Sequence, residues 1–179
     1  LCADTGLPFW MIPQAFAWSN TLGAHEVEKF KKSHIPTQDE LDAMPLLCAI
    51  SGARGFVFYG THYILIRPEK ILPGAGKEQW NRICKTAELL KWMEPYIMCE
   101  KGAVPIKIKA DKPDQLYGAF FEIKKGDARV ILSGVDTPAS GEFTIEGYPN
   151  LKSKLGRTEN LGGGKYRFTA NGVQADILY

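Results

Sequence analysis

Two short apolar runs, separated by one helical segment, are the strongest constraint on how this chain folds. The first run spans residues 7–18 and the second spans residues 55–59, and neither alternates apolar with polar side chains. Strands buried on both faces have this pattern, which is typical of parallel sheets. Pro13 cannot donate a hydrogen bond to a sheet, so we expect the first strand to end near Ile12.

The segment between the two runs carries a helix start signal. Residues 19–36 are polar and irregular and predict a surface loop with at most one helical turn. Thr37 and Glu40 then have the spacing of a capping box, in which each side chain satisfies the other residue's backbone amide. The helix is expected to end at Gly52 and to kink near Leu41–Pro45, because proline removes a helical hydrogen bond. Its expected buried face consists of Leu41, Met44, Leu47, Cys48 and Ser51.

A strand, a helix and a second strand in this order predict a right-handed crossover with parallel strands. The second strand ends at Gly60, and the proline- and glycine-bearing residues 64–75 predict a loop. A second helix is expected over residues 77–98, with Pro95 bending or ending its last turn. The apolar face expected of it contains Trp80, Ile83, Ala87, Leu90 and Met93 or Trp92.

After Gly102 the apolar period changes from helical to two. Residues 104–109 alternate strictly, and turn residues separate several further short apolar segments. Evenly spaced short strands of this kind predict a small antiparallel β-sandwich. The expected strands are residues 104–109, 116–123, 128–135, 142–146, 165–169 and 173–178.

The sequence therefore predicts two parts, residues 1–100 with the parallel strands and residues 101–179 with the sandwich. Two parallel strands leave open edges, and parallel sheets occur almost only with several strands and both faces covered. We expect the missing strands to come from a preceding region, another chain or a second copy. The abrupt start at Leu1, without an initiator Met or a signal peptide, agrees with a chain that begins inside a larger protein. Self-association through residues 7–18 and 55–60 is a further expectation.

Composition excludes several classes of protein. With 45% apolar and 23% charged residues the chain is an ordinary globular protein, and its net charge of +2 offers no basic field for nucleic acid. No apolar run has the ~18–20 residues of a membrane span. No two of the four cysteines have the Cys-x-x-Cys spacing that is typical of metal sites. Cys48 and Cys84 are expected to be buried, inert thiols. His25, His34 and His62 have no metal-ligand spacing either, so we expect no metal and no cofactor.

Residues 8–16 and the block from Pro36 to Tyr59 resemble the seventh strand, seventh helix and eighth strand of glycoside-hydrolase-like (β/α)8 barrels. Residues 77–98 then look like the closing helix, and residues 103–179 like the β-sandwich that often follows. The resemblance implies the last units of a TIM-type barrel, which needs about 250 residues when complete. It also implies that the chain is the C-terminal part of a carbohydrate-active hydrolase.

Active sites of such barrels lie at the C-terminal ends of the strands. The resemblance therefore implies a substrate-binding role for residues at those ends, with aromatic rings stacking on sugars and an amide bonding sugar hydroxyls. The equally weighted alternative to substrate binding is that these rim residues only pack against one another. A histidine at the position of His62 more often forms loop hydrogen bonds than acts in catalysis. The substrate-binding candidates are Gln14, Trp18, Tyr59, His62 and Tyr63.

One departure from the family pattern matters for catalysis. Glycoside hydrolysis needs two carboxylates, and Gln14 stands where many related barrels have a glutamate. No acidic residue stands at either strand end, so we assign no catalytic residue and expect this chain alone to be inactive. A degenerate barrel that only binds is one alternative. A non-catalytic carbohydrate-binding or protein-binding module is another, favoured if these sandwich aromatics are exposed: Tyr117, Tyr148, Tyr166 and Phe168.

Overall fold

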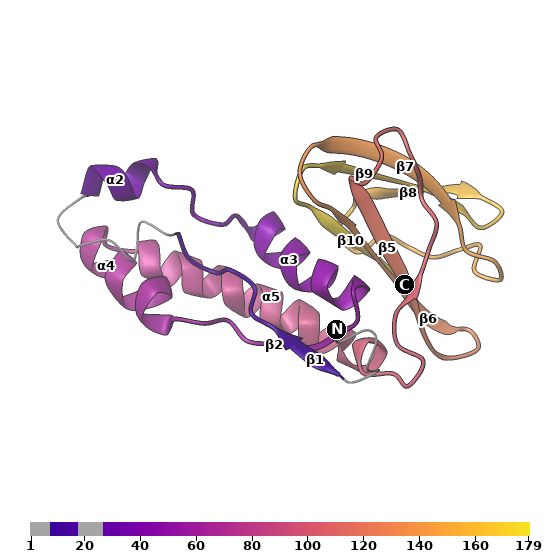
Figure 1. Ribbon diagram of the computed structural model, residues 1–179, viewed down its shortest axis with the longest axis horizontal. Helices are drawn as coiled ribbons and strands as arrows, with labels where there is room; N and C mark the ends of the chain where they lie inside the picture. Colours follow the sequence, from indigo (N-terminus) through magenta and orange to yellow (C-terminus); the bar gives the residue numbers. More distant parts are fainter. Residues whose placement is uncertain (1–7, 18–26) are drawn as a thin grey trace.

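The computed structural model describes residues 8–17 and 27–179, which form a mixed α/β structure (Figure 1). Helices and a small parallel sheet occupy one end of the elongated molecule, and two antiparallel sheets occupy the other. The described residues contain no closed barrel. No helix among them is both long and apolar enough to cross a membrane.

The parallel sheet has two strands, β1 (Phe9–Met11) and β2 (Ala53–Phe56). They pair in parallel, with Phe9 opposite Ala53 and Met11 opposite Phe56. Helix α3 (Gln38–Ile50) connects them, and the short helix α2 (Val27–Lys32) precedes it. The predicted strand–helix–strand unit with parallel strands is thus confirmed.

Helix α3 begins at the predicted capping box. The Thr37 hydroxyl accepts a hydrogen bond from the Glu40 amide at 3.3 Å, and the Glu40 carboxylate accepts one from the Thr37 amide at 2.8 Å. The helix continues through Pro45, whose ring is buried. The expected buried face is partly wrong, because Leu47 and Cys48 are only half-buried and Ser51 is exposed. The residues that α3 does bury are Leu41, Ala43, Pro45, Leu46 and Ala49.

The loop expected over residues 64–75 is mostly helical instead. A π-helical turn, η2 (His62–Ile66), runs directly into α4 (Arg67–Ile71). Pro68 lies in the first turn of α4, a position where proline is common in helices. Helix α5 (Ala75–Ile97) follows and contains Pro95 in its last turn, so the predicted second helix is confirmed within two residues at each end.

Two four-stranded antiparallel sheets make up the rest of the chain. Their strand orders are β10-β6-β5-β3 and β4-β7-β9-β8. The strand expected over residues 104–109 is divided in two, and its halves join different sheets; β8 has no counterpart among the expected strands. The strands are β3 (Val104–Pro105), β4 (Lys109–Ala110), β5 (Leu116–Lys124), β6 (Asp127–Gly134), β7 (Pro138–Thr144), β8 (Thr158–Gly162), β9 (Lys165–Asn171) and β10 (Ala175–Leu178).

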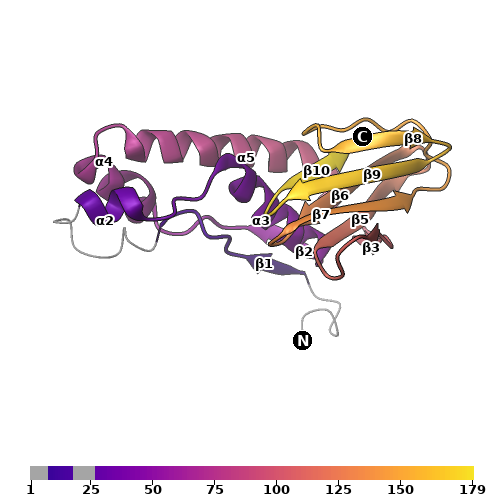
Figure 2. The same ribbon diagram turned by 90° about the horizontal axis from the view of Figure 1, so that it is seen from above.

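The helices pack on one of these sheets and not only on the parallel pair (Figure 2). One apolar core joins Leu46 of α3 and Met93 of α5 to Phe121, Ile131 and Ile177 of β5, β6 and β10. A second core fills the space between the two antiparallel sheets, with Tyr166 and Phe168 at its centre. The order of layers is helices, first sheet, second sheet.

The expectation that the first strand is buried on both faces is wrong for the described chain. Trp10 is 69% exposed and Ile12 is 64% exposed. Gly55 lies opposite Trp10 in the register, and the alternate residues that follow β2 are exposed as well: Val57 is 42% exposed and Tyr59 is 62% exposed. The helices cover only the other face of the β1–β2 pair, since alternate residues of a strand point to opposite sides.

Candidate functional site

The candidate site lies where β1 and β2 end. The chain leaves β2 after Phe56, continues through Phe58 and Tyr59, turns at Gly60 and enters the π-helical turn η2 at His62. Gly60 has a φ of 88°, and a Cβ there would lie 3.2 Å from the Tyr63 ring. Glycine therefore allows both the left-handed turn and the close approach of Tyr63 to the backbone.

Three of the sequence-predicted residues lie together on this connection. His62 and Tyr63 make an edge-to-face contact with ring centroids 5.6 Å apart, and Tyr59 precedes them by a few residues. His62 and Tyr59 are exposed, whereas Tyr63 is half-buried. Trp18, the fourth predicted residue, lies outside the described residues.

Tyr63 joins the ends of the two strands. Its ring centroid is 5.5 Å from that of Phe16, which follows β1. The guanidinium carbon of Arg67, four residues after Tyr63, lies over the same ring, 5.4 Å from its centroid. The Arg67 amide donates to the His62 carbonyl, which is the bond that closes the π-helical turn. We call Phe16, Tyr59, His62, Tyr63 and Arg67 the strand-end cluster.

Gln14 lies beside this cluster rather than in it. Its amide nitrogen donates to the Phe16 carbonyl oxygen at 2.9 Å, so one hydrogen-bonding group of the side chain is already used. Gln14 also lines a mostly apolar groove of about 310 Å³ with His34 and Glu40. The structure therefore places Gln14 in a groove that also contains residues at the start of α3.

Glu40 is the acidic residue that shares a groove with a predicted site residue. Its carboxylate accepts from the Thr37 amide and hydroxyl and lies 2.8 Å from the His34 ring nitrogen Nε2. Burial raises the pKa of Glu40, but the hydrogen bonds from Thr37 and the contact with His34 outweigh it and leave the pKa below its ordinary value. The carboxylate is thus held ionised as the cap of α3, which is a structural role.

Sequence reasoning missed Arg67, His34 and Glu40 as neighbours of the site. The capping box reveals Glu40 as a helix cap, but no pattern places that helix start beside Gln14. Arg67 lies in residues expected to be a loop, and only the π-helical turn brings it over Tyr63. Within residues 8–17 and 27–179, no three histidine, cysteine or acidic side chains gather closely enough to hold a metal ion.

Two further sequence-based expectations concern exposure. Of the four aromatic residues that would favour a binding module, Tyr166 and Phe168 are fully buried and Tyr148 is bonded to Glu122 at 2.6 Å, while Tyr117 is 41% exposed. They do not form one exposed face. The expectation for the cysteines is wrong for Cys84, which is exposed because it faces away from the core of α5, and Cys48 is half-buried.

Comparisons of the chain with protein-family models, curated proteins and solved structures find no match. The strand-end cluster is therefore interpreted from its own chemistry. It combines exposed aromatic and imidazole rings with a guanidinium group. Rings of this kind can stack on flat apolar faces, and the imidazole, phenol and guanidinium groups can form hydrogen bonds.

Proposed function

We propose that this chain is the C-terminal part of a carbohydrate-active glycoside hydrolase and contributes sugar-binding residues but not the catalytic carboxylates. The supporting observation is the strand-end cluster: the His62 and Tyr63 rings are in contact beyond the C-terminal ends of two parallel strands, and Tyr59 lies exposed on the same connection. Loops at that end of a parallel sheet commonly form ligand sites. Aromatic rings suit the apolar faces of sugars, and the polar tips suit their hydroxyls.

The proposal includes a finer architecture. In it, β1, α3, β2 and α5 are the last units of a (β/α)8 barrel, and the two antiparallel sheets are an appended β-sandwich. The parallel pairing of β1 with β2 and the core shared by the two antiparallel sheets support it. The remaining strands and the carboxylate pair would come from elsewhere in the barrel, since hydrolysis requires two suitably spaced carboxylates.

Binding of oligosaccharides by the chain tests the proposal. We expect a member of a neutral and acidic oligosaccharide panel to bind, measured by isothermal titration calorimetry. Tyr59→Ala and His62→Ala should each weaken that binding about tenfold, which corresponds to ~1.4 kcal/mol. The matched control is Tyr117→Ala, which removes an exposed tyrosine from β5 and should leave the dissociation constant unchanged.

Three results would count against this function. No member of the panel binding at millimolar concentration would remove the sugar-binding role. An equal loss in Tyr117→Ala would show that binding is not at the strand-end cluster. Glycoside hydrolysis by the chain alone would show that the carboxylates are present after all.

A non-catalytic assembly module is the second candidate. The observation that favours it is the exposed apolar face formed by Trp10, Ile12, Val57 and Tyr59. Monomeric soluble proteins rarely expose contiguous apolar patches of large area without an interaction to cover them. Association of the chain in the absence of sugar, together with no oligosaccharide binding, would favour this candidate over the first.

A further inference from the structure

The edge of β2 that faces away from β1 has no strand beside it among the described residues. The Val57 amide donates to the Met11 carbonyl at 3.0 Å, so the backbone groups of Val57 point toward β1. Successive residues of a strand direct their amides and carbonyls to opposite edges. The backbone groups of Phe56 and Phe58 therefore point toward the open edge, where they suit a further strand.

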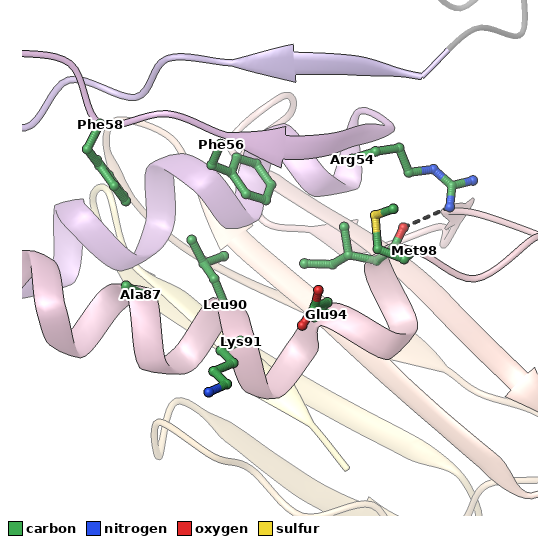
Figure 3. Close-up of a pocket in the computed structure, with 9 residues that line it drawn as sticks. Arg54, Phe56, Phe58, Ala87, Leu90, Lys91, Glu94 and Met98 are labelled. Carbon is green, nitrogen blue, oxygen red and sulfur yellow. Dashed lines mark hydrogen bonds between the residues drawn. The ribbon is translucent and has the colours of Figure 1, made fainter.

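An apolar groove runs beside this open edge. It has a volume of about 290 Å³ and lies between β2 and helix α5. Figure 3 shows Phe56 of β2, and Phe58 on the segment that follows it, extending toward Leu90 and Ala87 of α5. Arg54 closes one end, where its guanidinium donates to the Ile97 carbonyl at 2.9 Å. Side chains of a strand that pairs with the open edge of β2 would therefore lie in this groove.

The outer edge of β1 offers the complementary half of such a contact. Because the Met11 carbonyl bonds to β2, the backbone groups of Trp10 and Ile12 point away from β2. Met11 lies opposite Phe56 in register, so its side chain points to the helix-covered side of the sheet, and it is still 39% exposed. Trp10 and Ile12 lie on the uncovered face.

We propose that β1 of a second copy of this chain adds to the open edge of β2, parallel to it. Met11 of the second copy then enters the groove against Phe56, Phe58 and Leu90. Trp10 and Ile12 of the second copy continue the exposed apolar face beside Val57 and Tyr59. A second copy fits because β1 is parallel to β2 within one chain and carries apolar side chains on both faces.

This contact joins two different surfaces, β2 of one copy and β1 of the next. Such head-to-tail contacts either close into a ring or continue as a filament, and they do not stop at a symmetric dimer. The inference does not rest on the proposed carbohydrate binding, since association is measured without any sugar.

Light scattering coupled to size-exclusion chromatography of the whole chain tests the contact. We expect the molar mass to rise above the 19.9 kDa monomer as concentration rises through the micromolar range. Met11→Lys blocks the β1 side, and Ala87→Lys blocks the groove side on an exposed position of α5. Each variant alone should remain a monomer. The control, Leu161→Lys, adds the same charge at an exposed apolar residue of β8 and should associate like the native chain.

Mixing the two blocked variants is the decisive experiment. One native groove and one native β1 remain in the mixture, on different copies, so an equimolar mixture should form a heterodimer and nothing larger. Loss of association in both variants without recovery on mixing would overturn the head-to-tail arrangement. A native chain that stays at monomer mass at every concentration would overturn the second copy as the occupant, and circular dichroism confirms that each variant is folded.

Discussion

Asp176 is a buried carboxylate that accepts several hydrogen bonds. It is fully buried in β10, and its oxygens accept hydrogen bonds from the Ser153 hydroxyl at 2.6 Å and the Leu155 amide at 2.8 Å. The Arg157 and Ile177 amides donate to it at 2.9 and 2.8 Å. One side chain therefore holds the segment between β7 and β8 against the edge of the first sheet.

We expect Asp176→Asn to lower the free energy of unfolding by about 3 kcal/mol. The shape is kept, but an amide NH₂ replaces one accepting oxygen and faces backbone donors, so buried hydrogen bonds are lost. Urea unfolding followed by circular dichroism measures the change. Asp136→Asn is the control, because Asp136 is exposed and should change stability by less than ~0.5 kcal/mol. A loss as small as the control's would contradict the structural role of Asp176.

At the residue scale, sequence reasoning succeeds where a role depends on neighbours in the chain and fails where it depends on distant ones. Thr37 and Glu40 are three residues apart, and their mutual capping follows from that spacing. Apart from the adjacent Ile177, the partners of Asp176 lie about twenty residues away, and those of Asp39 are Arg157 and Gln174, far along the chain. No local pattern encodes such pairs.

The cap of α3 gives a prediction at the scale of one element. In the folded chain the pKa of Glu40 is below its ordinary value. Ionised Glu40 therefore stabilises the fold fully at pH values above the pKa that the group has in the unfolded chain. The contribution disappears as the pH falls through the folded-state pKa. We expect Glu40→Gln to cost about 1 kcal/mol at neutral pH and progressively less below the ordinary value of 4.5.

Thermal unfolding of native and Glu40→Gln chains between pH 3 and 7 measures this difference. Glu88→Gln, on an exposed position of α5, is the matched control and should show no comparable change with pH. A native-minus-variant difference that stays constant over the whole range would contradict the argument, since it would mean that the charge of Glu40 does not stabilise α3.

The sequence predicts that the long helices form, but it does not predict which sheets they pack against. Helices α3 and α5 follow from capping and periodicity, but Leu46 is buried in place of Leu47 because α3 faces the antiparallel sheet as well as the parallel pair. Strand β8 was missed because it is mostly exposed and polar and carries no apolar alternation. The π-helical turn was missed because Pro68 and Pro73 near it indicate a loop.

At the scale of the whole molecule, the two parts expected from the sequence share one core. Arg129 of β6 lies over the rings of Tyr96 and Trp92 of α5, with its guanidinium carbon 4.4 and 5.0 Å from their centroids. Ile131 of β6 is fully buried in the same core as Met93. The boundary between residues 1–100 and 101–179 remains a prediction, but the packing implies that both sides unfold together.

All four tryptophans lie in the first 92 residues, so their fluorescence follows the helical part, whereas circular dichroism near 215 nm follows the antiparallel sheets as well. Ile131→Ala removes apolar volume from β6 and should cost about 3 kcal/mol. Because β6 and α5 share a core, the urea midpoint should shift equally in both signals. Val104→Ala, at an exposed position of β3, is the control and should shift neither. A fluorescence midpoint that stays at the native value while the circular dichroism midpoint falls would show two independent folding units, because the helices would then keep their structure after the sheets have lost theirs.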